Sequence, residues 1–169
     1  VLFFFISTKF LPIVAGILPI WIIARNLNLL NTREVLILLY LGINLPLAVW
    51  MLRSFFQEVP VALIEASQID GANLWQQITR VMLPIVAPGL AATALLVLIF
   101  SWTEYFLAVQ LNPVDGSTIP VWITTFVSTR GNFLAKLSAA ATLATLPVII
   151  AGWIAQKRMI RGLAMGAVK

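Results

Sequence analysis

The run VMLPIVAPGLAATALLVLIFSWT, from Val81 to Thr103, is the longest uncharged stretch in the chain and decides its fold. A helix needs about 20 mostly apolar residues, at about 1.5 Å per residue, to cross the hydrocarbon core of a bilayer. Three other uncharged runs approach that length: Phe10–Ala24, Val35–Leu52 and Leu137–Gln156. The sequence therefore predicts an all-α, polytopic transmembrane helical bundle with four visible spans.

The composition also indicates a membrane protein. Of the 169 residues, 61% are hydrophobic and only 10% are charged, whereas soluble domains have about 25% charged residues. The sequence contains no His and no Cys, which excludes disulfides, His- or Cys-based catalytic triads and the usual zinc and haem ligands. We therefore expect no metal site and no catalytic residue in this chain.

The basic residues set the expected orientation. The chain has a net charge of +5, but its Lys and Arg are scattered rather than interleaved with aromatic residues, so we expect no nucleic-acid partner. The membrane side with more basic residues is read as cytoplasmic. That side would hold Lys9, Arg53, Arg80, Lys157, Arg158, Arg161 and Lys169, and the other side Arg25, Arg33, Arg130 and Lys136. We therefore expect the segment 54–80 and the C-terminal tail to be cytoplasmic.

Prolines interrupt all the predicted spans. An interior proline removes a backbone donor and kinks its helix, and in lipid the freed carbonyl must be satisfied by a neighbour or by a water-lined cavity. Two interpretations stay open, namely kinks tolerated in packing and helices that line a transport pathway. The prolines concerned are Pro12, Pro19, Pro46, Pro84, Pro88 and Pro147.

The segment Glu58–Pro88 reads as two short helices joined at a glycine. Pro60 suits the first turn of a helix, and Gly71 suits a left-handed C-terminal cap. Asn73, with Gln76 three residues later, is typical of a capping box that begins the second helix. Such a polar segment is either a surface helix resting on membrane lipid or a docking element for a soluble partner, and its composition leaves both open.

The spacing within this segment resembles a known motif. Glu65-Ala66-Ser67, three residues, Gly71, nine residues, Val81, one residue and Leu83-Pro84 is similar to the EAA loop of ABC-importer permeases. Ser67 stands for the second Ala of the family pattern, and Val81 stands for its Ile. The resemblance implies that residues 58–84 form a cytoplasmic coupling loop that inserts into an ATP-hydrolysing subunit. It assigns ATPase coupling to Glu65, Ala66, Ser67, Asp70, Gly71, Leu83 and Pro84.

The resemblance extends along most of the chain. Ser101–Phe106 and Arg161–Lys169 are similar to elements of the carbohydrate-uptake branch of these permeases. The family has a type I ABC importer permease fold with six spans. The resemblance therefore implies a single permease domain, residues 1–169, that is N-terminally incomplete, and the opening run Val1–Ile6, which has no initiating Met, agrees with that expectation.

The resemblance also predicts function and partners. It implies a multi-pass permease subunit in a bacterial inner membrane that translocates a carbohydrate or sugar alcohol. The expected partners are an ATP-binding subunit, a second and different permease subunit, a periplasmic or lipid-anchored solute-binding protein, and membrane lipid. The chain lacks a Gly-x-x-x-x-Gly-Lys phosphate loop, so ATP and Mg²⁺ would bind the partner and this subunit would hold no cofactor. The alternatives are another solute, such as a peptide or amino acid, a proton-coupled secondary transporter, or a membrane scaffold.

A second set of residues is a candidate translocation pathway: Asn44, Trp102, Glu104 and Tyr105. Asn44 offers hydrogen bonds, and the two aromatic rings offer stacking faces to a sugar, although aromatic residues near membrane interfaces commonly form belts. Glu104 is the acidic residue that adjoins the longest apolar run. A carboxylate in a membrane helix is costly and needs a partner or a function, so Glu104 is either a pathway residue or an anchor at a helix end.

Overall fold

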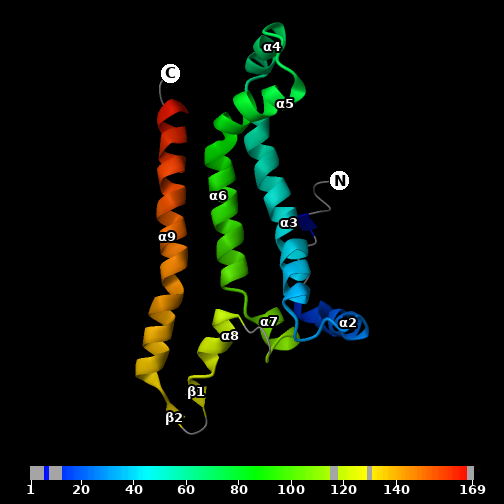
Figure 1. The fold of residues 1–169 in the computed structure, drawn as a ribbon, viewed down its shortest axis with the longest axis vertical. Helices are drawn as coiled ribbons and strands as arrows, with labels where there is room; N and C mark the ends of the chain where they lie inside the picture. The colour runs from blue at the N-terminus through cyan, green and yellow to red at the C-terminus, as the bar shows by residue number, and fades with distance from the viewer. Residues whose placement is uncertain (1–5, 8–12, 115–117, 129–130, 167–169) are drawn as a thin grey trace. The chain divides into compact units, whose positions relative to one another are not determined.

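The computed structural model describes residues 6–7, 13–114, 118–128 and 131–166, and these residues are mainly helical (Figure 1). Side chains at 128, 131, 132 and 157–166 lie outside the description. The elements are α2 (Ile13–Asn26), α3 (Arg33–Gln57), α4 (Val61–Ile69), α5 (Leu74–Gln76), the π-helix η2 (Gln77–Met82), α6 (Leu83–Trp102), α7 (Phe106–Leu111), α8 (Ile119–Thr124), β1 (Val127–Ser128), β2 (Gly131–Asn132) and α9 (Leu134–Gly166).

Among the described residues, three helices are long and apolar enough to cross a membrane. They are Arg33–Gln57, the continuous helical stretch Leu74–Trp102, and Leu134–Gln156. The fourth predicted span, Phe10–Ala24, corresponds to α2, which has 14 residues. At 1.5 Å per residue α2 is about 21 Å long, shorter than the ~30 Å hydrocarbon core, and Phe10–Pro12 lie outside the described residues. The prediction of a complete span there is therefore not met by α2 alone.

The segment between α6 and α9 contains short regular elements that the sequence analysis does not predict. They are the helices α7 and α8 and the hairpin of β1 and β2, in which Val127 pairs with Asn132. Each element has six residues or fewer. Hydrophobic periodicity needs a window of about 11–18 residues to identify a helix, so elements this short leave no periodic signal.

The described chain divides into two compact units. Unit 1 comprises residues 1–47 and 98–149, and unit 2 comprises residues 48–97 and 150–169. In unit 1, α7 packs against α2 (Figure 1). The side chains of Leu107, Ala108 and Leu111 in α7 are almost completely buried. The core of unit 1 consists of Ala24, Val35, Leu36, Leu107, Ala108, Leu111 and Val121.

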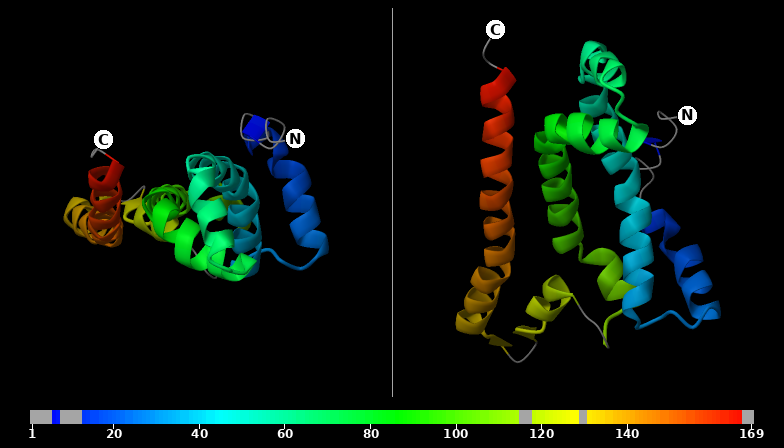
Figure 2. Two further views of the ribbon diagram at one scale, coloured as in Figure 1. Left: turned by 90° about the horizontal axis from the view of Figure 1, so that it is seen from above. Right: turned by 45° about the horizontal axis from the view of Figure 1, so that its top comes forward.

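Unit 2 brings α3 and α6 together through a small residue. The C-terminal part of α3 runs beside the first half of α6 in both views of Figure 2. Gly89 of α6 is buried, and a Cβ atom placed on it would collide with the ring of Phe55 from α3. Glycine here lets the Phe55 ring approach the backbone of α6 closely.

This contact yields a prediction for the substitution Gly89→Ala. The added methyl forces the Phe55 ring out of its position, and overpacking of this kind costs about 1–3 kcal/mol. We expect a lower midpoint of thermal unfolding for the detergent-purified protein. Gly42→Ala is the matched control, because a Cβ at Gly42 meets nothing within 4 Å. Equal midpoints for the two variants would contradict the proposed close approach.

Candidate functional site

The first candidate site is the coupling hairpin, which we define as residues 58–84. Its α4 begins after Pro60, the N-cap residue, and ends at Ile69, with Asp70 as the C-cap residue. Gly71 follows with φ 77°, the left-handed conformation that glycine adopts without steric penalty. The Gly71 N–H donates to the Gln68 carbonyl at 3.0 Å, and the Ala72 N–H donates to the Ser67 carbonyl at 2.9 Å. This pair of bonds is a Schellman motif, so the predicted glycine cap is confirmed.

The second half of the hairpin begins with the capping box that the sequence predicts. The Asn73 side chain accepts from the Gln76 N–H at 2.9 Å, and the Gln76 side chain accepts from the Asn73 N–H at 3.0 Å. The helical path then continues through η2 into α6 without a break in the chain order. The second half of the hairpin therefore leads directly into the longest apolar helix.

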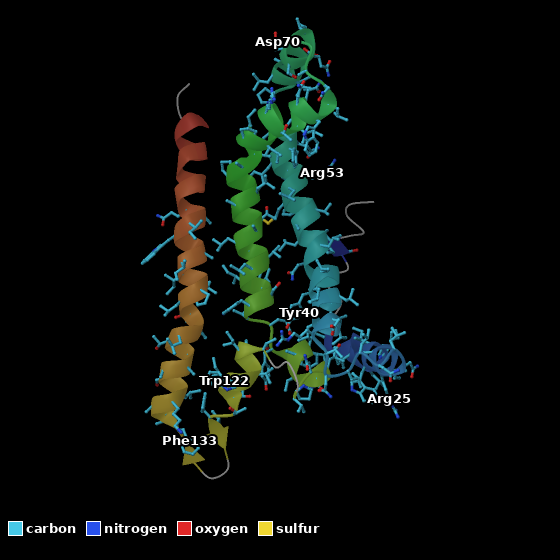
Figure 3. All side chains as sticks on the ribbon, viewed as in Figure 1. Arg25, Tyr40, Arg53, Asp70, Trp122 and Phe133 are labelled. Atoms are coloured by element: carbon cyan, nitrogen blue, oxygen red, sulfur yellow. The ribbon has the colours of Figure 1, made fainter. Side chains whose placement is uncertain are left out.

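The residues predicted to couple to an ATPase do not all point the same way. Glu65, Ala66, Asp70 and Gly71 are exposed, and Figure 3 shows Asp70 at the outer end of the hairpin, away from Arg53 on α3. Ser67 is 8% exposed, and its hydroxyl donates to the Ile64 carbonyl at 2.7 Å. Ser67 therefore faces inward and supports the hairpin from its buried side.

The last two residues of the motif, Leu83 and Pro84, begin α6. Leu83 is half-buried and Pro84 is exposed. In the structure they form the junction between η2 and the long apolar helix, away from the turn that carries Asp70.

The three most exposed large apolar side chains on the hairpin were not among the predicted residues. Ile69 is 87% exposed, and Leu74 and Trp75 are each 72% exposed. They flank the turn at Gly71 on both sides. Large apolar residues inside an otherwise polar segment were the available signal, because contiguous exposed apolar surface commonly marks an interaction site.

The second candidate site is the polar cluster, which we define as Tyr40, Asn44, Ser101 and Glu104 of unit 1. Asn44 is 6% exposed, and its Nδ2 donates to the Tyr40 carbonyl and to the Ser101 hydroxyl, both at 3.0 Å. The Tyr40 hydroxyl donates to Glu104 Oε2 at 2.9 Å. These bonds join α3 to the end of α6 and the turn that follows it, and Figure 3 shows Tyr40 where α3 passes that turn.

Glu104 also holds the start of α7. Its Oε1 accepts from the Leu107 N–H at 2.8 Å, and its Oε2 accepts from the Ala108 N–H at 3.2 Å. A carboxylate at a helix N-terminus satisfies free backbone donors and interacts favourably with the helix dipole. This geometry agrees with the anchor interpretation of Glu104, and a pathway role stays a prediction.

The two aromatic pathway candidates lie in different settings. Trp102 is half-buried, and its Nε1–H donates to the Ala144 carbonyl of α9 at 3.0 Å. Tyr105 is 41% exposed. Hydrogen bonds therefore connect Asn44 to Glu104 through Tyr40. The indole of Trp102 contacts α9, and the ring of Tyr105 is accessible.

The acidic residues that the structure describes give no sign of a metal site. Within the part of the chain that the structure describes, no group of three or more acidic residues lies close enough together to hold an ion.

The long apolar helices, the capped hairpin and the spacing of its motif define a class of membrane transport protein. Residues 1–164 match the family of binding-protein-dependent transport system inner membrane components. The chain belongs to this family, so it is a membrane component of an ABC-type transport system and not its ATP-hydrolysing subunit.

Three relatives illustrate the family. The chain is 37% identical to a probable ABC transporter permease protein of Sinorhizobium fredii, over 95% of the chain and 58% of the relative. It is 37% identical to the trehalose transport system permease protein SugB of Mycobacterium tuberculosis, over 94% and 59%. It is 32% identical to the diacetylchitobiose uptake system permease protein DasC of Streptomyces coelicolor, over 98% and 60%. The chain thus spans somewhat more than half the length of these relatives.

The polar cluster predicts a measurable coupling between Tyr40 and Glu104. Hydrogen bonds to charged groups contribute about 1.5–3 kcal/mol, so Glu104→Gln and Tyr40→Phe should each lower the midpoint of thermal unfolding. The double variant should be less destabilised than the sum of the two single variants, with an interaction energy of about 1 kcal/mol. Thr103→Val is the control, because the Thr103 hydroxyl is exposed and bonds only within its own helix. Strict additivity would show that the two side chains do not interact.

Proposed function

We propose that this protein is the permease subunit of an ATP-driven, binding-protein-dependent importer, and that its coupling hairpin docks on a separate ATPase subunit. Membership of the transport family supports the class of machine. The observation that carries the docking role is the hairpin itself, since Glu65, Ala66 and Asp70 are exposed. The turn is held on one side by the Schellman motif and on the other by the side-chain capping box. A rigid, exposed hairpin is what a mechanical contact needs.

The proposed contact surface extends beyond the motif. Ile69, Leu74 and Trp75 are the most exposed large apolar residues around the turn, and they supply apolar area next to the carboxylates of Glu65 and Asp70. Buried apolar area and aromatic anchors commonly carry most of the energy of an interface. The partner surface would therefore combine an apolar cleft with donors for the two carboxylates.

The proposed mechanism is alternating access. ATP binding would close the ATPase subunits, move the docked hairpins, and shift the membrane subunits between inward- and outward-facing states. Such a shift requires that ATP bind one state more tightly than the other. In this arrangement residues 54–80 face the cytoplasm, and α2 contributes to a fourth membrane crossing.

The proposed solute is a carbohydrate. Two relatives bear names that assign them to trehalose transport and to diacetylchitobiose uptake. The exposed ring of Tyr105 and the buried amide of Asn44 are suited to stacking and hydrogen bonding with a sugar. A sugar alcohol remains a narrower prediction, and a peptide or amino acid remains the alternative within the same architecture.

The proposed assembly contains a second permease subunit that differs from this chain, and an external solute-binding protein. The family description names dependence on a binding protein, which supports the latter. A proton-coupled transporter would need neither partner, and the family membership weighs against it and against a passive scaffold.

Site-directed cross-linking tests the docking role, because the sequence contains no native cysteine. Ile69→Cys places a thiol at the most exposed large apolar side chain of the hairpin. Cross-linking in native membranes, followed by mass spectrometry, should capture an ATPase subunit with a yield that changes when ATP is added. Val114→Cys, at a side chain 69% exposed outside the hairpin, is the control and should not capture it. Absence of an ATPase from the products at Ile69 and at Ala66 would refute the proposal.

A further inference from the structure

We propose that Gln77 is a positioning residue that fixes α4 to η2, so that the hairpin and α6 move as one lever. Gln77 lies among the nine residues that the motif leaves unspecified. The inference rests on the proposed function, because a lever matters only if the hairpin is pushed by a partner. The motif specifies no residue type at position 77 and assigns no role to its side chain.

The peptide groups of Ala72 are the connecting point. The Ala72 N–H donates to the Ser67 carbonyl of α4 at 2.9 Å. The Ala72 carbonyl accepts from Gln77 Nε2 at 2.8 Å. One residue of the turn is therefore bonded to α4 on one side and to η2 on the other.

The other side-chain hydrogen bonds of the described hairpin are local. Ser67 bonds within α4, the Asn73–Gln76 pair closes the first turn of α5, and Thr79 bonds to the Trp75 carbonyl one turn back. Among the described residues 58–84, the Gln77 amide alone joins the turn after α4 to η2 by a side chain. Loss of one of the other bonds would loosen a helix end. Loss of the bond from Gln77 to the Ala72 carbonyl would loosen the connection between the turn after α4 and η2.

The packing around the joint favours a fixed angle. α4 packs against η2, and Ser67 on the inner face of α4 is buried. Gln77 itself is half-buried, so its hydrogen bond is partly shielded from water. If the Ala72 carbonyl lost this donor, water would replace the hydrogen bond only partly, because the site is partly shielded.

The irregular backbone of η2 explains why the connection between the hairpin and α6 needs an additional hydrogen bond from a side chain. η2 is a π-helical segment between the hairpin and α6, and the Leu83 N–H at its end donates to the Ile78 carbonyl, five residues back. Pro84 and Pro88 follow in α6 and have no N–H to donate. π-Helical turns are rare, and they occur as single turns within α-helices, frequently at functional sites. The Gln77 amide sits at the start of this irregular segment and holds it against the turn.

Gln77→Met isolates the role of the amide. Gln and Met have similar helix propensities and similar lengths, and the Gln77 N–H still donates to the Asn73 carbonyl. The variant therefore removes the bond to Ala72 while keeping the local helix. Gln77→Lys restores a long donor at the same place. Gln57→Met is the matched control, because Gln57 is an exposed glutamine at the end of α3, outside the hairpin.

The measurement separates contact from transmission and requires no knowledge of the solute. In native membranes that contain the whole transporter, Ile69→Cys reports contact with the ATPase. Leu96→Cys, 36% exposed on α6, reports movement through its rate of labelling by a water-soluble maleimide with and without ATP. Each reporter is introduced separately into the parent, Gln77→Met, Gln77→Lys and Gln57→Met backgrounds.

We expect Gln77→Met to keep cross-linking at Ile69 and to reduce the ATP-dependent change in labelling at Leu96 by about fivefold. Gln77→Lys should recover most of that change, and Gln57→Met should match the parent. Retention of the full ATP response in Gln77→Met, with cross-linking intact, would overturn the inference and leave the proposed function standing. Loss of cross-linking in Gln77→Met would also overturn it, because Gln77 would then shape the contact surface. Absence of ATPase cross-linking in the parent background would instead refute the proposed function.

Discussion

Unit 1 depends on satisfying the two ends of α7. This helix is the most buried element described, with Leu107 and Ala108 at 0% and Leu111 at 1% exposure. Helix ends leave backbone groups without partners, and in an apolar environment each such group costs several kcal/mol. Glu104 accepts from two N–H groups at the start of α7, and the Asn31 N–H donates to the Leu111 carbonyl at its end. A six-residue helix can thus occupy a core position.

The C-terminal end of α7 shows how a turn can serve two elements at once. Asn112 is fully buried, and its Nδ2 donates to the Thr32 carbonyl at 3.0 Å. Asn31, in the turn between α2 and α3, has φ 58°, a conformation that Asn tolerates better than most residues. The same turn therefore ends α2, begins α3 and closes α7. In the coupling hairpin, Ala72 likewise bonds to two elements, α4 and η2. These bonds hold the direction of an exposed helix, whereas those around α7 allow a helix to be buried.

The parts of this structure that the sequence predicts are local ones. Gly71 and the Asn73–Gln76 capping box act within a few residues of themselves, so their spacing reveals them. The inward orientation of Ser67 is harder to predict, because a motif records spacing and not the side of the helix that packs. The partner of Glu104 is harder still, since Tyr40 lies 64 residues away in the chain. Uncharged length locates three long helices well, and fails where a helix is as short as α2, α7 or α8.

Asn44 illustrates where hydrogen bonding in unit 1 is incomplete. Its Nδ2 makes two hydrogen bonds, yet no donor in the described part of the chain bonds to its buried Oδ1. A buried acceptor without a partner costs about 1–3 kcal/mol, and such groups in native structures call for an explanation such as water or a ligand. Pro46, two residues on, removes a further backbone donor from the same stretch of α3. A water molecule or a solute hydroxyl that donates to Asn44 Oδ1 would supply the missing hydrogen bond. Glu104 already accepts hydrogen bonds from three donors. Of these two pathway candidates, Asn44 therefore has the stronger physical argument.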